Sequence, residues 1–294
     1  MKKGGKKSRT RLKRALFWFV LGAMVVLVTL VSGELLVRLF NPQPAMFPRW
    51  KHSPRYGNIF PPDTAIVHNC PGRWRFVYTT NDYGFRGKTI PLSENYDQQN
   101  IVVLGDSFSF GSGVNDGEEY PAVLSDLLGE RFEVVNLSMA GWGLTQQIRA
   151  FYELGRLYQP DVVILQFCAN DLLDNFQHEV TTLQDGQFVF QDTSVQRSLI
   201  KDLISKCLLL QKSQLYCLLR SIKNRSYWEE RKRRSERLSK KKQVPPHEEF
   251  YVELLEAFAR TLHKQKIPLL MISPEDGVYH FPLFKETVKE LEKR

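Results

Sequence analysis

Residues 101–111 read IVVLGDSFSFG. Four apolar residues end at Gly105, and a carboxylate and a hydroxyl, those of Asp106 and Ser107, follow at once. A short apolar run bounded by glycine is typical of a strand that is covered on both faces. We therefore expect a buried strand over 101–105 that turns directly into a helix, with Ser107 at the turn.

The chain after this strand alternates between apolar runs and segments with helical spacing. The runs expected to be strands are residues 101–105, 132–138, 162–167 and 267–273. The segments expected to be helices are residues 120–130, 144–158, 247–266 and 282–294. Strands and helices in alternation predict a parallel α/β sheet with right-handed crossovers. A further short strand is expected over 73–80, before the turn NDYGFRG.

The N-terminus has the pattern of a membrane anchor. Residues 15–33 contain no charged residue, which is close to the length of about 20 residues that crosses a bilayer. Residues 1–14 carry eight Lys/Arg and no acid, so the positive-inside rule keeps them in the cytoplasm and places the chain after Glu34 outside, in the periplasm or at the cell surface. A cleaved signal peptide is the alternative, but its apolar region is normally shorter, at about 7–15 residues.

These patterns divide the chain into four parts. We expect a basic cytoplasmic tail over 1–14, a transmembrane anchor over 15–40, an extended linker over 41–72 and an α/β domain over 73–294. Within that domain, the strand–helix rhythm breaks at about 176–246, which we interpret as an insertion. It holds a possible hairpin with an Asp-Gly turn, an amphipathic helix over 200–224 and then a basic run.

The charge pattern argues against nucleic-acid binding. The net charge is +9, but residues 1–14 and residues 220–242 each carry +8, which leaves −7 for the rest of the chain. The high charge therefore belongs to two segments and not to the body of the protein. For the basic run 220–242 two interpretations are open: a solvated helix, or a contact with anionic lipid or an anionic cell-wall polymer.

Three predicted strands end in residues that acyl transfer requires. The first ends in Gly105-Asp106-Ser107, the second in NLSMAG up to Gly141, and the third in Ala169-Asn170-Asp171. In an open parallel sheet, ligands bind at the carboxyl ends of the strands. There a serine hydroxyl can attack a carbonyl carbon, while N–H groups and an asparagine amide stabilise the resulting oxyanion. The bland alternative is that Ser107 is only a helix-capping serine.

The GDSFSFG, NLSMAGWG and CAND blocks together resemble the GDSL/SGNH hydrolase superfamily. The NDYGFRG segment also looks like a motif of its extracytoplasmic members. The resemblance implies a flavodoxin-like three-layer α/β/α fold and chemistry through an acyl-serine. It assigns Ser107 as the nucleophile, and the N–H groups of Ser107 and Gly141 with the Asn170 side chain as the oxyanion hole. It implies no cofactor and no metal, and the four cysteines lack metal-ligand spacing.

The sequence departs from the superfamily at the catalytic base. The family carries a DxxH block in which the histidine activates the serine and the aspartate orients the histidine. Here the late candidates are Asp276 and His280, with three residues between them and no fifth strand before them. The favoured interpretation is that this sequence ends before the true block. His280 acting as a variant base, or an inactive domain, are the other two.

The function expected from the sequence is a membrane-anchored serine esterase or O-acyl transferase. Its partner would be an ester substrate, such as an acylated carbohydrate or lipid. The competing hypothesis is a non-catalytic SGNH-like module that binds a glycan or another partner. The residue patterns do not separate hydrolysis from transfer, because water and a sugar hydroxyl would use the same acyl-serine.

Overall fold

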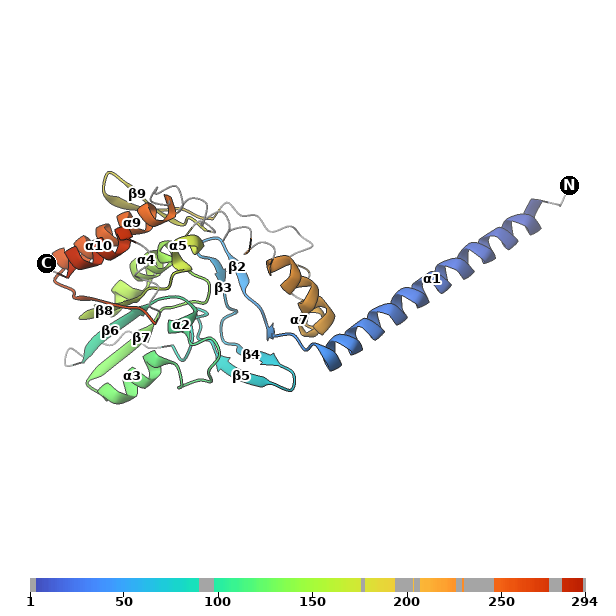
Figure 1. The fold of residues 1–294 in the computed structure, drawn as a ribbon, viewed down its shortest axis with the longest axis horizontal. Coiled ribbons are helices and arrows are strands. Elements are labelled where there is room, and N and C mark those ends of the chain that lie inside the picture. The colour runs from blue at the N-terminus through green and yellow to red at the C-terminus, as the bar shows by residue number, and fades with distance from the viewer. Residues whose placement is uncertain are drawn as a thin grey trace.

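The computed structural model describes residues 4–89, 98–175, 178–193, 203, 207–225, 229, 246–274 and 282–292. A long N-terminal helix, α1 (Gly4–Phe40), projects from an α/β domain (Figure 1). Residues Arg11–Phe40 of this helix are long and apolar enough to cross a membrane, and their most apolar window is not buried in the protein. An isolated apolar helix of this kind is unstable in water, because no core covers it.

The centre of the domain is a four-stranded parallel sheet with the order β11-β8-β6-β7. These strands are β6 (Gln99–Leu104), β7 (Phe132–Asn136), β8 (Val162–Gln166) and β11 (Leu269–Ile272). Val102 of β6 lies opposite Val135 on one side and Val163 on the other. Each predicted strand of this sheet is therefore confirmed. β7, β8 and β11 are shorter than the apolar runs suggested, and β6 begins two residues earlier and ends one residue earlier than expected.

Helices cover both faces of the sheet, which explains why its strands are apolar throughout. On one face, Ile101, Val103, Val134 and Ile164 pack with Leu124 of α3 (Tyr120–Leu128). The larger core, on the other face, joins the sheet to three helices: α4 (Leu144–Glu153), α9 (Pro246–Lys264) and α10 (Pro282–Leu291). Figure 1 shows α3 below the sheet and α4, α9 and α10 above it. The expected three-layer α/β/α fold is confirmed.

The short helical turns of the domain lie at strand ends. They are α2 (Ser107–Phe110) after β6, the 3-10 turn η1 (Gly155–Tyr158) before β8, and α5 (Asp171–Asp174) after β8. Two of the residues expected to form the site lie here: Ser107 is the first residue of α2, and Asn170 is the N-cap residue of α5. The candidate site residues thus follow the carboxyl ends of β6 and β8, as the sequence predicted.

Residues 41–72, which we expected to be an extended linker, are folded onto the domain. They contain four short strands: β1 (Ala45–Phe47), β2 (Lys51–Ser53), β3 (Gly57–Ile59) and β4 (Ala65–Cys70). With β5 (Trp74–Thr79), which matches the strand expected over 73–80, β1 and β4 form an antiparallel sheet of order β1-β4-β5. Phe60 and Ile66 are fully buried in the main core. Burial of such apolar side chains holds this segment to the domain.

The described part of the insertion contains a hairpin and two helices. The hairpin pairs β9 (Thr181–Gln184) with β10 (Gln187–Phe190), and its turn residues Asp185 and Gly186 both have positive φ, as the Asp-Gly signal predicted. The single helix expected over 200–224 is divided into α7 (Leu208–Lys212) and a second helix over 214–225. The division falls at Ser213, whose backbone is extended and whose Oγ accepts from the Tyr216 N–H at 3.1 Å, as an N-cap does.

Candidate active site

The turn after β6 is built around a glycine that no larger residue could replace. A Cβ at Gly105 would lie 2.4 Å from the Ser109 Oγ and 2.7 Å from the Gln166 Oε1. The Gln166 Oε1 accepts hydrogen bonds from the Asp106 N–H at 3.2 Å, the Ser109 N–H at 3.3 Å and the Ser109 hydroxyl at 3.0 Å. One side chain of β8 therefore fixes the backbone on both sides of Ser107.

Asp106 orients the start of α2. It is fully buried, and its Oδ1 accepts from the Phe108 N–H at 3.0 Å, which caps the helix. Its Oδ2 accepts from the Ser107 hydroxyl at 3.5 Å. Ser107 itself is partly exposed and Phe108 is exposed, so the hydroxyl is accessible from solvent. As the first residue of α2, Ser107 presents an N–H that has no partner within the helix.

The turn after β7 lies against the same backbone. The Met139 N–H donates to the Gly105 carbonyl at 3.2 Å, and the Asn136 Nδ2 donates to the Ser109 carbonyl at 3.0 Å. The turn is closed by the Trp142 N–H donating to the Met139 carbonyl at 3.2 Å. Gly141 lies inside this turn with a φ of +79° and is exposed. Its left-handed backbone explains why the position carries glycine.

The third strand end brings Asn170 to the same carboxylate as Ser107. The Asn170 Nδ2 donates to the Asp106 Oδ2 at 3.1 Å and to the Asp174 Oδ2 at 2.9 Å. Ser107 and Asn170 thus share the Asp106 Oδ2 as acceptor. An amide nitrogen has two N–H donors, and here both point to carboxylates. Asn170 must therefore give up one of these hydrogen bonds to donate to an oxyanion.

A buried acid lies behind this cluster. Asp171 is fully buried, and its Oδ2 accepts from the Cys168 N–H at 3.1 Å. Burial is the main cause that raises the pKa of Asp171 well above its ordinary value, and the nearby Asp106 carboxylate raises it further. Burial likewise raises the pKa of the Tyr251 hydroxyl. Asp171 therefore holds a proton where an exposed aspartate would have lost it.

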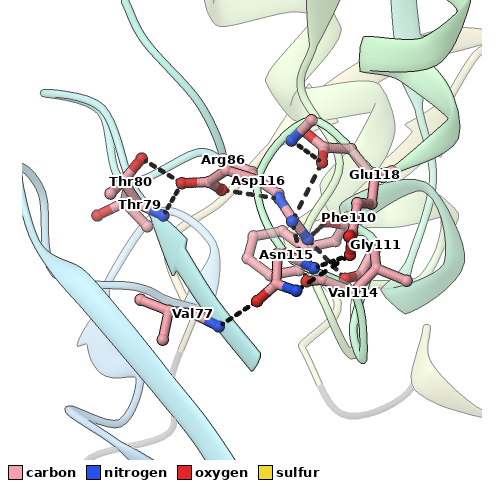
Figure 2. Close-up of polar contacts among 12 residues, drawn as sticks. Val77, Thr79, Thr80, Arg86, Phe110, Gly111, Val114, Asn115, Asp116 and Glu118 are labelled. Atoms are coloured by element: carbon pink, nitrogen blue, oxygen red, sulfur yellow. Dashed lines mark hydrogen bonds and ion pairs between the residues drawn. The ribbon is translucent and has the colours of Figure 1, made fainter. Parts of the chain in front are cut away.

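Arg86, from the NDYGFRG segment, holds the loop that follows α2. Its side chain is fully buried, and its Nη1 donates to the carbonyls of Phe110 at 2.9 Å and Gly111 at 2.5 Å. Its Nη2 donates to the Val114 carbonyl at 3.1 Å and pairs with Glu119 at 3.1 Å. Figure 2 shows the guanidinium enclosed by these carbonyls. Its central carbon also lies 4.9 Å from the centre of the Tyr78 ring.

The same loop is bonded to the N-terminal sheet (Figure 2). The Asn115 Oδ1 accepts from the Val77 N–H at 3.1 Å, and the Asp116 Oδ2 accepts from the Thr79 N–H at 2.9 Å. Asp116 also pairs with Arg86 at 3.4 Å. The segment before the central sheet therefore supports the turn that presents Ser107, although the two lie more than 20 residues apart in sequence.

The structure brings together three of the predicted site residues, and the other two lie outside the residues that it describes. Ser107, Gly141 and Asn170 lie on turns that contact one another or share Asp106. Asp276 and His280 lie outside the described residues. Sequence reasoning missed the roles of Gln166 and Arg86. A polar residue at the end of the third apolar run was a signal for Gln166, and the NDYGFRG motif was a signal for Arg86.

Comparison with known proteins defines the class of this domain. The GDSL-like Lipase/Acylhydrolase family model matches residues 103–280, which is more than half of the chain. The match includes the turns after β6, β7 and β8, where the candidate residues lie. The chain belongs to the GDSL-like lipase/acylhydrolase family, and the resemblance drawn from its sequence is confirmed.

Two curated relatives match part of the chain. Thioesterase 1/protease 1/lysophospholipase L1 of Escherichia coli (strain K12) is 32% identical over 81 residues, which is 28% of this chain and 39% of that protein. Arylesterase of Vibrio mimicus is 29% identical over 116 residues, which is 38% of this chain and 54% of that protein. The matched stretch thus spans between two fifths and just over half of the relatives' length.

Two solved structures are also similar to part of this chain. The crystal structure of TesA has a TM-score of 0.35 at 15% identity, covering 66% of this chain and 73% of that one. AlinE4, an SGNH-hydrolase family esterase, has a TM-score of 0.35 at 16% identity, covering 67% of this chain and 72% of that one.

The Arg86 contacts predict a large loss of stability on removal of the charge. Arg86→Met leaves three carbonyls without their donor and Glu119 as an uncompensated buried carboxylate, which costs about 3–5 kcal/mol. Arg86→Lys retains the charge but not the forked geometry, so it should cost less. Chemical unfolding of the detergent-solubilised protein measures both variants. A loss below about 1 kcal/mol for Arg86→Met would contradict this account.

The raised pKa of Asp171 predicts a pH dependence of a definite sign. The folded chain holds the proton more tightly than the unfolded chain, so this group contributes stability at low pH. That contribution is lost as pH rises from about 4 towards the raised pKa, at up to about 1.4 kcal/mol per pH unit. Asp171→Asn removes the titration. The stability of the parent protein relative to Asp171→Asn should therefore fall as pH rises above about 4, and a constant or rising difference would refute it.

Proposed function

We propose that this protein is a membrane-anchored serine esterase or O-acyl transferase that works through an acyl-Ser107 intermediate. The observation that carries the proposal is the meeting of three strand-end turns around Gly105–Ser109. Membership of the GDSL-like lipase/acylhydrolase family supports ester chemistry. The substrate would be an ester, such as an acylated carbohydrate or lipid.

The proposed reaction starts with attack of the Ser107 Oγ on the ester carbonyl carbon, as the hydroxyl proton passes to a general base. The tetrahedral oxyanion accepts hydrogen bonds from the N–H groups of Ser107 and Gly141 and from the Asn170 amide. The base returns its proton to the leaving alcohol, and an acyl-serine remains. Water or a second hydroxyl then takes the acyl group, which gives hydrolysis or transfer.

Among the residues of this sequence, we propose His280 as the base and Asp276 as the residue that orients it. The family match extends to residue 280, so it includes both residues. An imidazole is the side chain best suited to this role near neutral pH, because its ordinary pKa is about 6.5. The spacing of three residues between Asp276 and His280 departs from the two residues of the family's DxxH block.

We also propose that α1 anchors the domain outside the membrane it crosses. The exposed apolar surface of Arg11–Phe40 and the basic residues before it support an anchor with a cytoplasmic N-terminus. A signal sequence that is removed after export is the competing possibility. The two differ in whether the mature protein retains residues 1–40, which N-terminal sequencing of the membrane-bound protein decides.

Replacement of the nucleophile tests the reaction. Ser107→Ala in the full-length protein should lower the rate of p-nitrophenyl acetate hydrolysis by about 10³-fold or more, towards the rate without enzyme. Ser112→Ala is the matched control, because Ser112 is an exposed serine of the same loop and should leave the rate unchanged. Equal rates for the parent protein and Ser107→Ala would exclude Ser107 as the nucleophile.

Replacement of the base tests the role of His280. His280→Ala should lose nearly as much rate as Ser107→Ala, because the two groups act as a unit. His263→Ala, which removes an exposed histidine of α9, should keep the parent rate. If His280→Ala is fully active, the base lies elsewhere. If the parent protein itself turns over no ester, the non-catalytic binding module becomes the better account.

A further inference from the structure

The two helices of the insertion, α7 and 214–225, are fastened to the end of the anchor helix. The Glu34 carboxylate of α1 accepts hydrogen bonds from the Ser213 hydroxyl at 2.8 Å and from the N–H groups of Gln214 and Leu215, each at 2.9 Å. A Cβ at Gly33 would lie 3.2 Å from the Leu215 Cδ2, so the two helices touch. Figure 1 shows α7 beside the domain end of α1.

The chain that leaves α1 contacts the same two helices. The Gln43 N–H donates to the Gln214 Oε1 at 2.5 Å, and the Arg49 N–H donates to the Gln211 Oε1 at 2.9 Å. Both glutamines are buried. Polar side chains thus lock one face of the helix pair to the segment that follows the anchor.

The position of the Glu34 contact along α1 determines its depth relative to the membrane that α1 would cross. The charge-free run of the anchor ends at Gly33, and Glu34 is the first charged residue after it. Glu34 therefore marks the outer boundary of the apolar segment, where a bilayer passes from hydrocarbon to headgroups. The start of the helix over 214–225 lies at that level, because Glu34 bonds to its first N–H groups.

The helix pair exposes apolar side chains, and its sequence is basic. Leu209 is 82% exposed, and Leu208, Leu219 and Ile222 are each more than half exposed. Residues 207–225 contain Lys212, Arg220, Lys223 and Arg225 and no acidic residue. Exposed leucines interleaved with cations, on short helices beside a membrane boundary, are typical of elements that lie in the bilayer interface.

We propose that residues 207–225 are an interfacial docking element that inserts Leu208, Leu209, Leu219 and Ile222 into the outer leaflet of an anionic phospholipid bilayer. The cations of the element bind the headgroup phosphates. This contact fixes the orientation of the catalytic domain against the membrane, which a single flexible tether could not do. The proposal rests on the proposed anchoring role of α1.

Depth measurements at three sites on the full-length protein test the proposal. Single cysteines at Leu209, Val26 and Leu127 are labelled with an environment-sensitive fluorophore on a Cys207→Ser background. The other cysteines, Cys70, Cys168 and Cys217, are buried and stay in place. The protein is reconstituted in phosphatidylcholine vesicles that contain phosphatidylglycerol and a nitroxide-bearing phospholipid. Leu127, on α3, is the matched control because it is 80% exposed.

The expected result is loss of emission at Val26 and at Leu209, with no loss at Leu127. Replacement of Lys212, Lys223 and Arg225 by glutamine should reduce the loss at Leu209 and leave that at Val26 unchanged. Quenching at Val26 with none at Leu209 overturns docking and leaves the anchor intact. Absence of quenching at Val26 overturns the anchor and the proposal together. A Leu209 label that is shielded from water but not quenched by lipid assigns the surface to a protein partner or second copy, and also overturns it.

Discussion

The Oε1 of Gln166 accepts three hydrogen bonds from the turn after β6, and the rest of the site depends on this contact. The contact requires that no side chain intervene, which is why Gly105 stands between β6 and Ser107. Because β6 and β8 are hydrogen-bonded neighbours, pairing of the strands carries Gln166 to the turn automatically. The position of the candidate nucleophile is thus a consequence of sheet register.

Two further sets of contacts support the same turn. Asn136 and Met139 bond to it from the end of β7, and Arg86 holds the loop beyond α2. Arg86 is fully buried with Glu119, so this support also commits the chain to a buried ion pair. Removal of one partner leaves a buried charge without its counter-charge and strongly destabilises the folded protein. The loop is therefore sensitive to single substitutions. The N-terminal strands are therefore part of the site and not only a tether.

The sheet and the strand-end turns could be predicted from the sequence, because buried parallel strands are continuous apolar runs and their ends carry the polar residues. The fold of residues 41–72 was harder to predict, since three of its four strands have only three residues, which is too short to show a period of two. The break at Ser213 was hidden by an apolar pattern that continues through it. The roles of Gln166 and Arg86 depend on contacts between segments far apart in sequence. A polar residue at a strand end and the NDYGFRG motif mark the two positions, but they do not show what each side chain contacts.

Ser107 is the proposed nucleophile, presented by a turn that neighbouring segments hold in place. The most direct measurement is mass spectrometry of the full-length protein after incubation with a fluorophosphonate, which forms a stable adduct with activated serines. We expect one added phosphonyl group, mapped to the peptide that contains Ser107. Absence of an adduct, or an adduct on another serine, would contradict this proposal.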